Sequence, residues 1–164
     1  MIVICVILMV ILVAENIIFI KMLRQRKELM KQSYRQTEKF RVFFELVAEW
    51  FTGEMSGKRI SDWISARGYK TVAIYGMGTL GELTYLNLCK NKEICIKYGL
   101  DKNTSIKTTG MEIYNLDNCP EQVDLIIVTA VTAYEEIKKE ISQKIGFECA
   151  IISLLQLVEE MYIG

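Results

Sequence analysis

The chain contains no histidine and a single proline, Pro120, among its 164 residues. Without an imidazole it has no Ser-His-Asp triad, no Cys-His pair and no histidine-ligated metal. It also has no net charge, because 20 Lys and Arg balance 20 Asp and Glu. Its basic residues are not interleaved with aromatic ones on one strand or helix, so nucleic acid is not an expected partner.

Paired cysteine motifs are missing as well. The five cysteines are odd in number and fall in no CxxC pair or metal-ligand spacing: Cys5, Cys89, Cys95, Cys119 and Cys149. We therefore expect no metal site. Scattered cysteines of this kind are typical of reduced, mostly buried thiols in an intracellular domain.

Three closely spaced glycines follow a predicted strand and indicate a phosphate-binding loop. The β-forming run Thr71–Tyr75 leads into glycines at 76, 78 and 81, and an apolar-periodic segment follows. Such a pattern predicts a strand, a tight turn and a helix whose N-terminus faces a phosphate. The phosphate-binding residues would be Gly76, Met77, Gly78, Thr79, Leu80 and Gly81.

An acidic residue completes this pattern. Ile94–Leu100 reads as a second strand, and Asp101 follows it, 20 positions after Gly81 (101 − 81 = 20). A carboxylate in this place would accept hydrogen bonds from a ribose hydroxyl, and Lys102 beside it could pair with a phosphate. Asn103 belongs to the same loop. The alternative is that the glycines serve only tight packing in an α/β domain that binds nothing.

The remaining pattern predicts a Rossmann-like α/β fold, a parallel sheet with helices on both faces. The expected strands are 71–75, 94–100, 111–116, 123–129 and 149–153, and helices are expected near 60–67, 80–90, 134–145 and 154–161. We expect the strand order 3-2-1-4-5. The carboxyl ends of the strands would then gather Gly76–Gly81, Asp101–Asn103 and Thr129–Ala133 around one crevice, with Thr129 and Tyr134 on its sugar or base side.

The N-terminal residues 1–23 read as a transmembrane anchor. Apolar residues fill most of 2–20, about the ~20 needed to cross a bilayer, and basic residues follow at once. The positive-inside rule would put the N-terminus outside and the globular domain in the cytoplasm, with the cell membrane's lipid bilayer as a partner. A signal peptide cleaved after Leu12-Val13-Ala14 is the alternative. Glu15 would lie near the interface or be protonated, unless it serves a function within the membrane.

A long helix over 21–51 follows, because the segment contains neither Gly nor Pro. Leu23, Met30, Phe44 and Phe51 share one heptad position, which indicates a weak coiled coil and permits a homodimer through residues 21–51. The aromatic residues of Phe40–Phe51 predict a docking or dimerising face. We take 24–56 as a helical stalk, the glycines at 53 and 57 as its boundary, and 57–164 as the nucleotide-binding domain.

Three segments, Gly68–Gly78, Lys97–Asn103 and Val123–Ala130, give the chain from about Phe40 onward a family resemblance. They resemble small Rossmann-like, NAD(P)-binding-type domains associated with bacterial surface-polysaccharide biosynthesis. That family is similar to the nucleotide half of nucleoside-diphosphate-sugar epimerases and dehydratases, and to the N-terminal domain of sugar-acyl transferases. The resemblance implies a nucleotide or nucleotide-sugar site close to the membrane, with glycan-assembly enzymes as partners.

Three functions follow from these patterns. The first is a membrane-anchored module that binds a nucleotide or nucleotide-sugar and regulates or scaffolds cell-surface glycan assembly. The second is an NAD(P)-dependent enzyme, an oxidoreductase or epimerase completed by a partner. Tyr134 and Lys138 have the spacing of a catalytic pair, but here they open the helix after the fourth strand, so we assign no catalytic residue. The third is a structural protein without a ligand.

Overall fold

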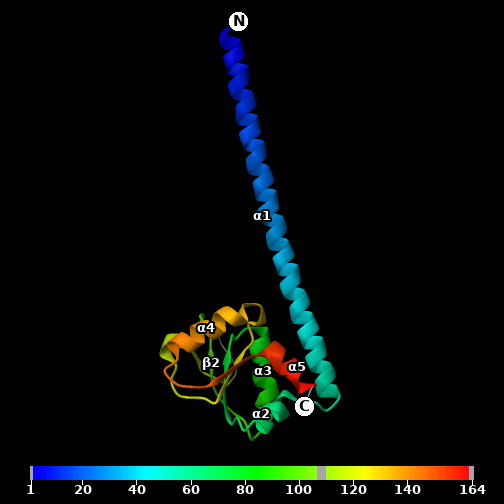
Figure 1. Ribbon diagram of the computed structural model, residues 1–164, viewed down its shortest axis with the longest axis vertical. Coiled ribbons are helices and arrows are strands. Elements are labelled where there is room, and N and C mark those ends of the chain that lie inside the picture. Colours follow the sequence, from blue (N-terminus) through cyan, green and yellow to red (C-terminus); the bar gives the residue numbers. More distant parts are fainter. Residues whose placement is uncertain (1, 107–109, 163–164) are drawn as a thin grey trace. The chain divides into compact units, whose positions relative to one another are not determined.

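The computed structural model describes residues 2–106 and 110–162, with side chains from residue 15 onward. The chain divides into two compact units, Met1–Phe44 and Glu45–Gly164. The described helices are α1 (Ile2–Met55), α2 (Ile60–Ala66), α3 (Thr79–Leu88), α4 (Tyr134–Lys144) and α5 (Leu154–Met161) (Figure 1). The strands are β1 (Thr71–Tyr75), β2 (Cys95–Leu100), β3 (Ile113–Tyr114), β4 (Leu125–Val128) and β5 (Ala150–Ser153), with short 3₁₀ turns η1 (Leu116–Asn118) and η2 (Val131–Ala133).

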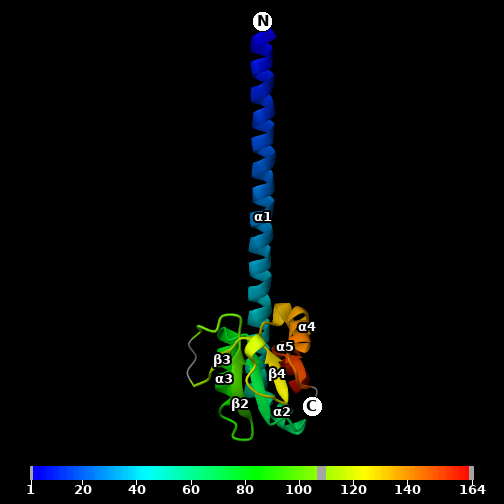
Figure 2. The ribbon, with the colours of Figure 1, turned by 90° about the vertical axis from the view of Figure 1, so that its left-hand side faces the viewer.

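The five strands form one parallel sheet in the order β3-β2-β1-β4-β5. This order confirms the predicted 3-2-1-4-5 winding. In Figure 2, β2 and β3 lie toward one edge of the sheet and β4 lies toward the other. The winding changes direction between β1, which pairs with β2, and β4, its other neighbour. Ligands of open α/β sheets bind at such a switch point, outside the carboxyl ends of the strands.

Helices cover both faces of the sheet, as predicted. Figure 1 shows α4 on one side of the strands and α2, α3 and α5 on the other. The α4 face is a core of buried side chains that includes Tyr98, Ile126, Ile137 and Ile141. Ile137 and Ile141 are four residues apart, so both point from α4 to the sheet. Both faces are covered, which explains why all four residues of β4 are buried and apolar.

The amino ends of β1 and β4 are tied by one carboxylate. Asp124 accepts hydrogen bonds from the N–H groups of Lys70, at 2.9 Å, and Thr71, at 2.8 Å. These backbone donors, with the hydrogen bond to the Thr71 side chain, hold the pKa of Asp124 below its ordinary value. Because the pKa is lowered by folding, this contribution to stability is present above the ordinary pKa and is lost as the pH falls through the folded-state value.

The last turns of α1 belong to the second unit. Leu46 and Trp50 are buried there, and the Tyr162 hydroxyl donates to the Glu49 carbonyl oxygen at 2.6 Å. The predicted long helix is thus confirmed and extends to Met55, with Gly57 in a left-handed conformation just beyond it (φ 79°). Glycine adopts this conformation at little cost, so it suits a helix end.

The prediction of a transmembrane helix over residues 1–23 is wrong. No helix in the described part of the chain is long and apolar enough to cross a membrane. The side chains of residues 2–14 lie outside the described ones, and those that follow include Glu15, Asn16 and Lys21 within the predicted span. Within the described side chains, these polar residues interrupt the apolar sequence that a span of ~20 residues requires. Residues 2–23 are part of the continuous helix α1, and the single-pass placement with the N-terminus outside loses its basis.

The prediction of mostly buried cysteines is also wrong. Cys89 and Cys95 are exposed, and Cys119 and Cys149 are partly buried. All four are free thiols, whereas Cys5 lies outside the described side chains. The sulfurs of Cys89 and Cys95 lie at the end of α3 and the start of β2, where the chain passes over the surface.

Candidate functional site

The glycine loop leaves β1 through a backbone turn that favours glycine. Gly76 has φ 93°, and its N–H donates to the Leu100 carbonyl oxygen at 2.7 Å. A Cβ atom on Gly76 would lie 2.9 Å from Thr129 Oγ1. Both the conformation and the space therefore require glycine where the loop crosses from β1 toward α3.

Gly81 brings the first turn of α3 against this loop. A Cβ atom at Gly81 would lie 2.2 Å from the Gly76 carbonyl oxygen and 3.1 Å from its carbonyl carbon. Backbone atoms cannot rotate away as the end of a long side chain can. The third glycine of the motif is thus a packing residue that fixes the helix N-terminus relative to the strand.

Gly78 precedes the first turn of α3 and leaves it open. Its backbone is extended (φ −74°, ψ −162°), and no side chain caps the helix. The first bond of the helix runs from the Glu82 N–H to the Gly78 carbonyl oxygen at 3.0 Å, so the N–H groups of 79–81 precede the intrahelical bonds. A Cβ atom on Gly78 would meet nothing within 4 Å. These donors and the positive end of the helix dipole suit an anion.

The Asp101 carboxylate lies beside the loop at the end of β2. One of its oxygens accepts from the Met77 N–H at 2.7 Å and the other from the Asn103 N–H at 2.9 Å. A carboxylate oxygen has two acceptor positions, so each keeps one for another donor. Asp101 therefore positions the glycine loop and can still accept hydrogen bonds from a ligand. The spacing of the motif does not reveal that Asp101 positions the loop.

Met77 contributes only its backbone to this edge. Its side chain is buried and lies over β2, where a Cβ atom on Gly99 would come within 2.9 Å of Met77 Cγ. Glycine inside a strand often marks such a close approach. Gly99 in β2 could therefore have indicated that a side chain packs on this strand.

A cavity of about 280 Å³ lies on the α4 side of Asp101. Opposite charges close its rim: Lys102 Nζ lies 3.5 Å from Glu140, and Lys144 Nζ lies 3.2 Å from Glu140 and 2.8 Å from Asp117. Lys102, whose side chain is 77% exposed, thus contacts α4. The cavity is lined by Tyr75, Asp101, Lys102, Asn115, Leu116, Asp117, Glu140 and Lys144.

Tyr75, the last residue of β1, lines this cavity. Burial raises the pKa of its phenol, and the nearby charges of Glu140 and Asp101 raise the pKa further. Its hydroxyl therefore stays protonated at neutral pH. Strand periodicity places Tyr75 on the α4 face with Ala73. The glycine motif does not include Tyr75, and only this periodicity could have indicated that it lines the cavity.

Thr129 and Tyr134, both predicted to line the crevice, contact the protein's own backbone. Thr129 is buried and its hydroxyl donates to the Gly76 carbonyl oxygen, so it holds the loop in place. The Tyr134 hydroxyl donates to the Ile151 carbonyl oxygen at 3.0 Å. Ile151 belongs to β5, the last strand of the sheet, so Tyr134 satisfies an acceptor of an edge strand. The structure thus brings Gly76–Gly81 and Asp101–Asn103 together but directs the Tyr134 hydroxyl elsewhere.

The substitution Tyr134→Phe separates an edge-strand role from a catalytic one. It removes the donor to Ile151 and leaves the ring in the core, so we expect the free energy of unfolding to fall by about 1 kcal/mol. Urea denaturation measures this change, and nucleotide affinity should stay within about twofold of that of the unchanged chain. A loss of affinity without a loss of stability would contradict this role.

Comparison with known proteins leaves the family open. No family model matches the chain. A curated relative, the BRCA1-A complex subunit Abraxas 1 of Xenopus laevis, is 31% identical over 90 residues, which cover 55% of this chain and 21% of that protein. The chain therefore spans about a fifth of the length of this relative.

Two solved structures are similar in part. UDP-D-quinovosamine 4-dehydrogenase from Vibrio fischeri shares 18% identity over 52% of this chain and 77% of that one, with a TM-score of 0.44. An NADPH-dependent glyoxylate/hydroxypyruvate reductase from Sinorhizobium meliloti, in apo form, shares 19% identity over 52% of this chain and 38% of that one, with a TM-score of 0.33. Likenesses of this size do not bear on ligand or activity.

Proposed function

We propose that the unit formed by residues 45–164 is a binding module for a nucleotide or nucleotide-sugar. The observation that supports it is the open N-terminus of α3, where Gly78 leaves the N–H groups of 79–81 without a cap while Asp101 lies on the adjacent loop. The phosphates would be held by the N–H groups of this turn. A ribose hydroxyl would donate to the acceptor positions that Asp101 keeps.

The residues present fit the nucleotide half of NAD(P) as well. Asp101 offers acceptors, which suit a free 2′-hydroxyl rather than a 2′-phosphate. Lys102, the nearest candidate partner for such a phosphate, lies 3.5 Å from the carboxylate of Glu140. The proposal therefore prefers a ligand with an unmodified ribose, such as NAD or a UDP-sugar. When bound, the nicotinamide of NAD would supply hydride transfer.

Binding without chemistry is the function that this site supports best. The chain has no histidine, and the hydroxyl of Tyr134, which has the spacing of a catalytic pair with Lys138, is hydrogen-bonded to β5. Lys138 lies 5.5 Å from the centre of the Tyr134 ring, on α4. A reductase or epimerase reaction would need an acid or base from another chain. A role in regulating glycan assembly is the part of the proposal that the resemblance, rather than the geometry, supports.

Thermal denaturation of the full chain with UDP-glucose, ADP, NAD and NADP tests the proposal. A ligand at one hundred times its dissociation constant adds about 2.7 kcal/mol of stability, which should raise the melting temperature by roughly 10 °C. Uridine and adenosine are the matched controls, because they lack the phosphates and should shift the melting temperature far less. Cooperative melting with no shift by any phosphorylated ligand would contradict the proposed function.

A further inference from the structure

An apolar row runs along the part of α1 that lies in the first unit. Leu23, Met30 and Tyr34 are 50%, 73% and 72% exposed. Spacings of seven and four residues place all three on one side of the helix. A long helix gains most of its stability from the packing of such a row, so an exposed row of this length indicates a surface that another chain covers.

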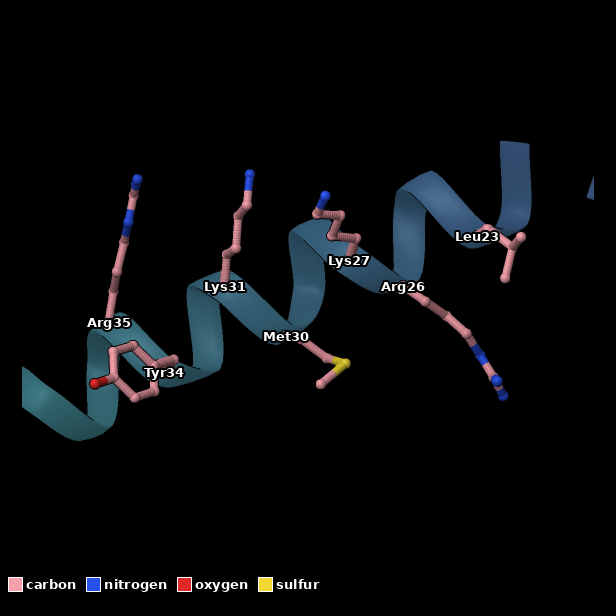
Figure 3. Close-up of a pocket in the computed structure, with 7 residues that line it drawn as sticks. All are labelled: Leu23, Arg26, Lys27, Met30, Lys31, Tyr34 and Arg35. Atoms are coloured by element: carbon pink, nitrogen blue, oxygen red, sulfur yellow. The ribbon is translucent and has the colours of Figure 1, made fainter. Parts of the chain in front are cut away.

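Basic residues flank this row. Figure 3 shows Lys27, Lys31 and Arg35 extending together on one side of the helix, while Arg26 points another way beside Met30 and Leu23. Lys31 pairs with Glu28 at 3.1 Å, and both side chains are more than half exposed. Residues 1–44 contain eight Lys and Arg against three Glu, a net charge of +5. Since the whole chain is neutral, residues 45–164 carry −5.

These charges argue against a second copy of the chain as the partner. If Leu23 and Met30 are placed at heptad position d, Lys27 falls at position a. Arg26, at position g, then faces Lys31 of the other copy, at position e. If they are placed at position a, Arg26 falls at position d. Both registers put a basic side chain in the apolar seam, and an antiparallel pair centred on Met30 would bring the two basic segments together.

We propose that this face of α1, residues 23–35, binds an acidic amphipathic helix of another protein. Apolar residues of the partner would pack on Leu23, Met30 and Tyr34, and its flanking Glu or Asp residues would pair with the basic rows. Helices recognise one another in this way, with apolar anchors supplying affinity and flanking charges choosing the partner. The proposal does not depend on the nucleotide site, so either can fail alone.

The probe is a fluorescein-labelled synthetic peptide with Leu at heptad positions a and d and Glu at e and g. Fluorescence anisotropy with the full chain should show saturable binding. We expect Lys27→Glu/Lys31→Glu/Arg35→Glu to weaken binding by at least about tenfold, and Met30→Asn, which keeps the charge, to weaken it by a similar factor. Lys39→Glu is the control for a charge reversal outside residues 23–35, because Lys39 is exposed and lies half a turn around the helix from Met30.

Circular dichroism checks that each variant keeps its helix, and Lys27→Gln/Lys31→Gln/Arg35→Gln replaces the charge reversal if it does not. Failure of the unchanged chain to bind the peptide would overturn the proposal. Unaltered binding by Met30→Asn, together with full competition by heparin, would also overturn it in favour of a general affinity for polyanions. Sedimentation velocity that shows a dimer which excludes the peptide would overturn it in favour of a second copy.

Discussion

The substitution Gly81→Ala should lower the free energy of unfolding by about 2–3 kcal/mol. Alanine normally favours a helix over glycine by up to about 1 kcal/mol, so the expected sign is the reverse of the usual one. The reason is the Gly76 carbonyl oxygen, 2.2 Å from the position of the new Cβ atom. The oxygen belongs to the backbone, so α3 must move away from the loop. The melting temperature should fall by roughly 10 °C or more.

Gly78→Ala is the matched control for this prediction. It makes the same chemical change three residues earlier, where a Cβ atom meets nothing within 4 Å and the φ of −74° suits any residue. Its free energy of unfolding should change by less than about 1 kcal/mol. Equal melting temperatures for the two variants would show that the approach of α3 to the loop is not as close as described.

The second large effect concerns affinity. Gly78→Asp should weaken the binding of a phosphorylated nucleotide by at least about thirtyfold, or ~2 kcal/mol. The new carboxylate lies at the start of α3, where it can cap the open N–H groups and interact favourably with the helix dipole. It therefore occupies the donors proposed for the phosphates and repels their charge. Stability in the absence of ligand should be unchanged or slightly higher.

Gly146→Asp controls for the change in net charge. Gly146 is exposed, follows α4, and its Cβ position is also free of neighbours. Isothermal titration calorimetry with UDP-glucose or NAD should show unchanged affinity for this variant and weak or absent binding for Gly78→Asp. If both variants bind as the unchanged chain does, the phosphates do not lie at this turn.

Local patterns in the sequence predicted most of the fold. Thr71–Tyr75 and Leu154–Met161 form the strand and helix expected there, because each lies between clear turn or capping residues. Ser153 caps α5 by accepting from the Gln156 N–H at 3.1 Å. The other strands differ from prediction by one or two residues at an end. These ends depend on pairing with neighbouring strands, and a local pattern does not contain that pairing.

The site was predicted less completely than the fold. Spacing alone placed Asp101 beside the glycine loop, because both follow the carboxyl ends of adjacent strands. The same spacing could not show that Tyr134 turns toward Ile151, or that Glu140 and Lys144 reach the cavity beside Asp101. Those contacts depend on the tilt of α4 across the sheet, which long-range packing decides.

In the N-terminal segment, the sequence predicted a feature that the described part of the structure does not have. The apolar residues of 2–20 and the basic residues that follow them suggested a membrane span, but no helix among the described residues is long and apolar enough for one. The continuous helix α1 joins that segment to the charged one that follows. The heptad pattern of 23–51 is imperfect, because Arg26 and Thr37 interrupt it. In our proposal, the basic residues of this segment disfavour pairing with a second copy and select an acidic partner.

The most direct test of the nucleotide site is a two-dimensional ¹H–¹⁵N spectrum of the full chain, titrated with UDP-glucose or with NAD, whichever raises the melting temperature more. The account predicts that the largest amide shifts fall on Gly78, Thr79, Leu80 and Gly81, with smaller shifts at Asp101 and Asn103. Those amides begin α3 or lie in the loop after β2. Large shifts confined to other parts of the chain, with these amides unmoved, would contradict it.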